Sequence, residues 1–61
     1  MKVREIIKII ENDSWYLKRT KGSHRQFKHP TRSGKVTIAG HERDDLHPKT
    51  EISILKQAGL K

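Results

Sequence analysis

Residues 22–24 place a glycine, a serine and a histidine next to one another, as Gly22-Ser23-His24. A histidine side chain has an ordinary pKa of ~6.5, so it can accept or donate a proton near neutral pH without a cofactor. Glycine lets backbone N–H groups approach a phosphate closely, and the serine adds a hydroxyl donor. The motif therefore predicts a proton-transfer site with His24 as the catalytic residue, although the same three residues are also typical of a plain hairpin turn.

Basic residues gather around this motif. From residue 18 to residue 35 the chain has seven basic residues and no acidic one, so the formal net charge of +7 belongs to this stretch alone. Such concentrated positive charge indicates a polyanion, most often RNA or DNA. The alternative is a solvated face that only keeps a small protein in solution. The residues that we predict to bind RNA are Lys18, Arg19, Lys21, Gly22, Ser23, Arg25 and Lys28.

RNA would supply its own nucleophile to such a site. A neutral imidazole at His24 can remove the proton from a ribose 2′-hydroxyl, which then attacks the adjacent phosphate and expels the 5′ oxygen. Lysine and arginine side chains nearby would offset the negative charge that develops on the phosphorane. This chemistry requires no metal ion and no small-molecule cofactor.

Two other groups of polar residues are alternatives as metal ligands. The first is the set of four histidines, but structural zinc sites usually include cysteine, which the chain lacks. The second is an acidic set that precedes a predicted helix. Its negative charge is expected instead to interact favourably with the dipole at the N-terminus of that helix. The members of these two sets are His24, His29, His41 and His47, and Glu42, Asp44 and Asp45.

Two of these histidines directly precede a proline, which predicts their positions in the secondary structure. His47 precedes Pro48, a residue favoured at the first position of a helix, so we expect His47 at a helix start. His29 precedes Pro30 and is expected at the end of a strand.

The composition suits one small domain. A chain of 61 residues forms a single domain, here 1–61, with a thin core. No apolar run approaches the ~20 residues of a membrane span, and no signal-peptide pattern is visible. The absence of cysteine fits a reducing compartment. We therefore expect a soluble, cytoplasmic protein.

Hydrophobic spacing predicts an α+β fold with the order helix, three antiparallel strands, helix. Apolar residues at i, i+3, i+4 and i+7 predict a helix over residues 2–11. Alternating residues predict strands over 15–20, 25–29 and 36–38, and a second helix starts at Pro48 and stops at Gly59. Both helices are expected to cover the same face of the three-stranded sheet, which leaves the other face open. The predicted inward-facing apolar residues of the first helix are Val3, Ile6, Ile7 and Ile10, and those of the second are Ile52, Leu55 and Ala58.

The residues on the open face depend on the turn between the first two strands. A two-residue turn between regular strands would separate Phe27 from the face that holds Trp15 and Leu17. A three-residue loop at 21–23 brings these apolar residues together, and we predict this register. The open face would then carry Tyr16, Lys18, Thr20, His24, Gln26 and Lys28.

Taken together, these segments resemble the HicA toxins, small endoribonucleases (mRNA interferases) of toxin–antitoxin pairs. The resemblance covers nearly the whole chain, with Ser14 and Ala39 standing where the family often has glycine and proline. The segments that carry it are the helix at 3–7, the strand at Trp15, Gly22-Ser23-His24 with Phe27 and His29-Pro30, the strand 36–38 followed by His41, and residues 54–60.

The resemblance implies a double-stranded-RNA-binding-domain fold, α-β-β-β-α, with His24 at the family's catalytic position. It also implies cytoplasmic mRNA as the substrate, no metal, and a HicB-type antitoxin protein that blocks the toxin. Two alternatives remain: a non-catalytic RNA-binding module of the same fold, and a small DNA-binding or protein-interaction domain. The latter is less favoured because neither helix is basic enough to enter a major groove.

Overall fold

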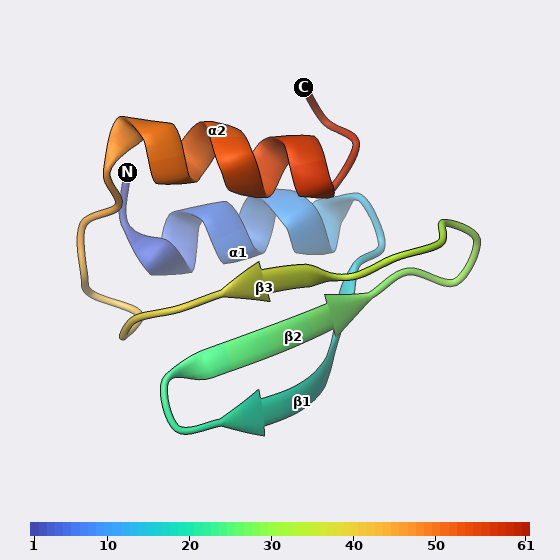
Figure 1. The fold of residues 1–61 in the computed structure, drawn as a ribbon, viewed down its shortest axis with the longest axis horizontal. Coiled ribbons are helices and arrows are strands. Elements are labelled where there is room, and N and C mark those ends of the chain that lie inside the picture. Colours follow the sequence, from blue (N-terminus) through green and yellow to red (C-terminus); the bar gives the residue numbers. More distant parts are fainter.

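The computed structural model describes all 61 residues and shows two helices on one side of a three-stranded antiparallel sheet. Figure 1 shows α1 and α2 side by side above the sheet, with β1 at the edge farthest from them. The predicted α+β fold and its α-β-β-β-α order are confirmed. The elements are α1 (Val3–Asn12), β1 (Tyr16–Lys21), β2 (His24–Lys28), β3 (Val36–Ile38) and α2 (Pro48–Gln57).

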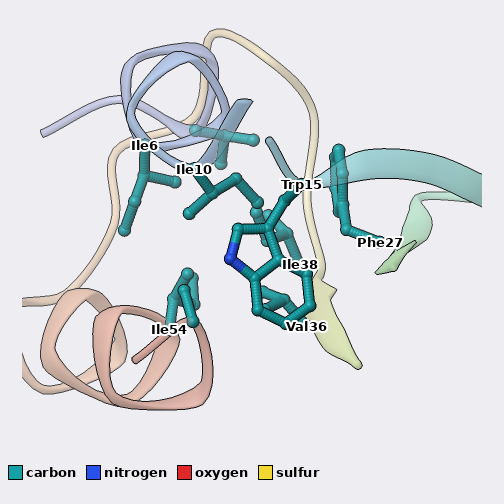
Figure 2. Close-up of a cluster of buried hydrophobic side chains, with 9 residues drawn as sticks. Ile6, Ile10, Trp15, Phe27, Val36, Ile38 and Ile54 are labelled. Atoms are coloured by element: carbon teal, nitrogen blue, oxygen red, sulfur yellow. The ribbon is translucent and has the colours of Figure 1, made fainter. Parts of the chain in front are cut away.

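One hydrophobic cluster joins the two helices to the covered face of the sheet. Trp15 lies in the middle of this cluster, between the helices and the strands (Figure 2). Its indole N–H is buried without an acceptor, so the residue contributes through its apolar surface. The buried residues are Val3, Ile6, Ile10, Trp15, Phe27, Val36, Ile38, Ile54 and Ala58.

The predicted stripe of α1 is confirmed, but that of α2 is wrong at one position. Ile52 is 37% exposed, whereas Ile54 is only 2% exposed and packs in the core. Residues 54 and 58 are four apart and lie on one face of the helix. This face of α2 packs against the core, with Ile54 in place of the predicted Ile52. Leu55 packs partly against the cluster.

α2 ends as the sequence predicts. Gly59 has a φ of +74°, a left-handed conformation that glycine adopts at little cost. The Leu60 N–H donates to the Leu55 carbonyl (2.8 Å), and the Gly59 N–H donates to the Lys56 carbonyl (3.1 Å). These two bonds form a Schellman ending.

The turn between β1 and β2 differs from the prediction. Lys21 pairs with His24, so the turn has two residues, Gly22 and Ser23, and not three. The pairing then shifts by one residue between Leu17 and Arg19, because Lys18 forms a β-bulge. This extra residue reverses the alternation of β1, so Leu17 still lies opposite Phe27 despite the shorter turn.

The two-residue turn and the bulge together set which β1 side chains occupy the open face. Residues that pair across strands share a face, and successive residues alternate. Arg19 and Lys21, rather than Lys18 and Thr20, therefore accompany His24. The register places on the open face Tyr16, Arg19, Lys21, His24, Gln26, Lys28 and Thr37.

Candidate nucleic-acid interface

His24 is the first residue of β2 and directly follows the hairpin turn. Gly22, at the first central position of this turn, has a φ of +59°. A two-residue hairpin turn of type II′ has a positive φ at this position. Hairpins favour this turn because its twist matches that of the flanking strands. A Cβ atom on Gly22 would meet no atom within 4 Å, so the glycine is needed for its backbone conformation and not for space.

His24 lines an open cleft beside this turn. The cleft has a volume of about 560 Å³ and no hydrophobic residue in its lining. The side chains of Arg19, Lys21 and His24 form no hydrogen bond or ion pair within the chain. Two cations and an imidazole are thus free to contact a ligand. We call this site the hairpin cleft; its residues are Arg19, Lys21, Gly22, His24 and Gln26.

The structure places three of the seven predicted RNA-binding residues in the hairpin cleft and the others outside it. Arg19, Lys21 and Gly22 lie in the hairpin cleft, and Lys28 lies farther along the same face, where its Nζ donates to the Gly34 carbonyl at 3.4 Å. The other three lie outside the cleft.

Lys18 is the residue of the bulge, and the Ser23 carbonyl accepts the Gly40 N–H at 3.2 Å. Arg25 points to the helix side of the sheet, where its guanidinium donates to the Gly40 carbonyl at 2.9 Å. The cleft also contains Gln26, which the predicted site did not include. Its position two residues after His24 in a strand is the signal that places both on one face.

The family model described as the HicA toxin of bacterial toxin-antitoxin matches residues 3–60. The chain belongs to the HicA toxin family. This HicA chain is therefore a toxin of a toxin–antitoxin system, and the family implies an antitoxin partner. A comparison with curated proteins gives no match.

Ser14 of this HicA toxin occupies a position where the resemblance indicates a common glycine. Its φ is +77°, and it is the one non-glycine residue with a positive φ. A left-handed conformation of this kind is least strained in glycine. The bend that leads from α1 into β1 therefore accounts for a glycine preference there.

His29 of the HicA toxin is held at both ring nitrogens. Nε2 lies 2.6 Å from the Asp13 carbonyl oxygen and therefore carries the proton that it donates. Nδ1 accepts from the backbone N–H groups of Thr31 (3.1 Å) and Arg32 (3.2 Å). The ring also packs edge-on against Trp15, with centroids 5.1 Å apart. β2 ends at Lys28, so His29 lies one residue beyond the strand whose end it was predicted to mark, in the loop that follows.

His47 has a structural position as well. It is the N-cap of α2, and its Nδ1 accepts the Lys49 N–H at 3.1 Å. The prediction that it lies at a helix start is confirmed. The two histidines without such side-chain contacts are His24 and His41.

The acidic residues ahead of α2 contact nearby groups of the chain. Asp44 Oδ2 accepts the His41 N–H at 2.9 Å, which closes a turn. Asp45 pairs with Lys2 at 3.1 Å. No group of three or more His, Cys, Asp or Glu side chains is placed to hold a metal ion.

Each helix of the HicA toxin has ten residues. Neither has the length and apolar character that crossing a membrane would take.

Proposed function

We propose that this HicA toxin is an endoribonuclease that cleaves mRNA in the cytoplasm, with His24 as the proton acceptor and without a metal ion. The observation that supports this proposal most is the unengaged imidazole of His24, which shares the hairpin cleft with two unpaired cations, Arg19 and Lys21.

The proposed reaction is a transesterification within the RNA. The neutral imidazole takes the 2′-hydroxyl proton, and the 2′ oxygen forms a bond to the adjacent phosphorus. The bond from phosphorus to the 5′ oxygen breaks, and this oxygen leaves with a proton from a neighbouring donor or solvent. Arg19 and Lys21 stabilise the extra negative charge of the phosphorane, because positioned cations act most strongly where charge develops.

The products test this route against a non-catalytic RNA-binding module. We expect fragments that end in a 2′,3′-cyclic phosphate and a 5′-hydroxyl, formed at an undiminished rate in excess EDTA. A single deoxyribose at the cut site should block cleavage there, since the nucleophile is then missing. Mass spectrometry of the fragments distinguishes these ends. Intact RNA after long incubation would favour the binding module, and cleavage at the deoxyribose would exclude the 2′-hydroxyl route.

We also propose that a HicB-type antitoxin protein covers the hairpin cleft with an acidic surface. The support is the same pair of unpaired cations on an open face, within a chain of net charge +7. Opposite charges across an interface mainly speed association, and salt screens them.

Association with the antitoxin should therefore slow as salt concentration rises. Lys21→Glu should slow it further at low salt, and Lys56→Glu on the far end of α2 serves as the control with the same charge change. Stopped-flow fluorescence can measure both rates. If the two variants associate equally fast, the antitoxin does not use this cleft.

A further inference from the structure

A second cleft lies where the segment after β3 meets the start of α1. Four polar residues line it, two of them arginines and one a histidine. We call this site the loop cleft; its residues are Arg4, His41, Glu42 and Arg43.

Hydrogen bonds to two backbone carbonyls hold the two sides of the loop cleft together. The Arg4 N–H, in the first turn of α1, donates to the Glu42 carbonyl at 2.9 Å. Lys2 Nζ donates to the Arg43 carbonyl at 3.2 Å. The Arg4 N–H therefore already has an acceptor, and the side chains of the cleft are the groups that remain to bind a ligand.

The chain segments that carry the two clefts are hydrogen-bonded to each other. Gly40, which precedes His41, donates its N–H to the Ser23 carbonyl at 3.2 Å and accepts the Arg25 guanidinium at 2.9 Å. Ser23 is flanked by Gly22 and His24, both in the hairpin cleft. Figure 1 shows the hairpin turn, the start of α1 and the segment after β3 at the same end of the molecule.

The cations of the loop cleft are unpaired. The three ion pairs of the structure involve the N-terminal amino group, Lys2 and Arg32, and not Arg4 or Arg43. The imidazole of His41 also has no side-chain hydrogen bond within the chain, since its contact with Asp44 is made by the backbone N–H. Two guanidinium groups and an imidazole in one cleft suit a phosphate group, which guanidinium groups bind through paired hydrogen bonds.

We propose that the loop cleft is a second phosphate-binding site for the same RNA strand. The substrate would run from the hairpin cleft past the Gly22-Ser23 turn to Arg4 and Arg43, so that each cut is made on a strand held at two points. This inference rests on the proposed function for the identity of the ligand, and it adds the path of the substrate.

The proposal predicts that neutralising Glu42 increases the affinity for RNA. Its carboxylate lines the same cleft and would repel a bound phosphate. If a phosphate binds there, neutralising Glu42 should strengthen RNA binding. A surface with no bound phosphate would show no such gain beyond that from any other acidic residue.

The test compares two RNA lengths in a His24→Ala background, in which cleavage is expected to be slow enough for binding to be measured. A dinucleotide fills one cleft, and a longer single-stranded oligouridylate spans both. The Arg4→Ala, Arg43→Ala double variant should bind the longer RNA roughly tenfold more weakly, because hydrogen bonds to charged groups are lost. Its log–log salt slope should become shallower by about 0.7 for each phosphate contact removed. Binding of the dinucleotide should stay unchanged, and Glu42→Gln should tighten binding of the longer RNA.

Matched controls decide the outcome. Lys56→Ala with Lys61→Ala removes the same charge near the other end of α2, and Glu11→Gln neutralises an acid at the far end of α1. Equal effects of the two double variants, or equal loss for both RNA lengths, would overturn the second site. Slower antitoxin association with unchanged RNA binding would assign the surface to the antitoxin instead and also overturn it. If the His24→Ala protein binds neither RNA, the proposed function itself fails.

Discussion

Replacing His24 with alanine is expected to lower the rate of RNA cleavage by roughly 10²- to 10⁴-fold, the usual contribution of general acid–base catalysis. The physical reason is the loss of the one imidazole in the hairpin cleft that can accept the 2′-hydroxyl proton. A gel-based cleavage assay with a labelled transcript measures the effect. Near-full activity of the purified variant would contradict the assignment.

The rest of the toxin should change little in this variant. The His24 side chain is exposed and has no hydrogen-bond partner in the chain, so its truncation leaves no buried group unsatisfied. Thermal unfolding and RNA binding should stay close to those of the unchanged protein. Free imidazole added to the assay should restore part of the activity, because it can occupy the vacated space and take the proton.

His41→Ala is the informative comparison for the same assay. Under the second-site proposal this change weakens RNA binding and so raises KM, while kcat is largely kept. A loss of kcat as large as that of His24→Ala would instead make His41 a second proton-transfer residue. His29 and His47 are poorer comparisons, because their rings hold the Asp13 carbonyl and the start of α2.

Phe27→Ala is expected to have the largest effect on stability. Phe27 is 1% exposed and belongs to the buried cluster, and removing such a side chain usually costs roughly 3–5 kcal/mol. At roughly 0.05–0.15 kcal/mol per residue, a chain of this length is stabilised by only about 3–9 kcal/mol. Much of the variant should therefore be unfolded at room temperature, as urea denaturation followed by circular dichroism can show.

Leu17→Ala is the matched control for this prediction. Leu17 pairs with Phe27 across the two strands and shares its face, but it is 49% exposed because the helices do not cover β1. Its truncation should cost about 1 kcal/mol or less. Phe27→Leu, which keeps an apolar side chain, gives a smaller and measurable loss if the alanine variant does not fold. Equal losses for Phe27→Ala and Leu17→Ala would contradict the larger contribution of the buried Phe27 side chain to stability.

The sequence by itself determined the features that depend on nearby residues. The spacing of Val3, Ile6 and Ile10 predicts α1, because side chains three and four apart share a helix face. Gly59 followed by Leu60 predicts the Schellman ending, since only local backbone geometry is involved. The concentration of charge around His24 likewise indicates the candidate site without any knowledge of the fold.

The tertiary structure decided which side chains accompany His24. A tight two-residue turn pairs Lys21 with His24 and so puts Arg19 and Lys21 on the open face, and a one-residue bulge at Lys18 keeps Leu17 opposite Phe27 despite this turn. Alternation along the sequence does not reveal such a bulge, because the strand is exposed along its whole length and no buried side chain marks the change of phase. Contacts between distant segments also bind Arg25 to Gly40 and His29 to Asp13. These partners are 15 and 16 residues away along the chain. Only the folded backbone, whose partly buried carbonyl groups need hydrogen-bond donors, therefore determines that Arg25 and His29 have structural contacts.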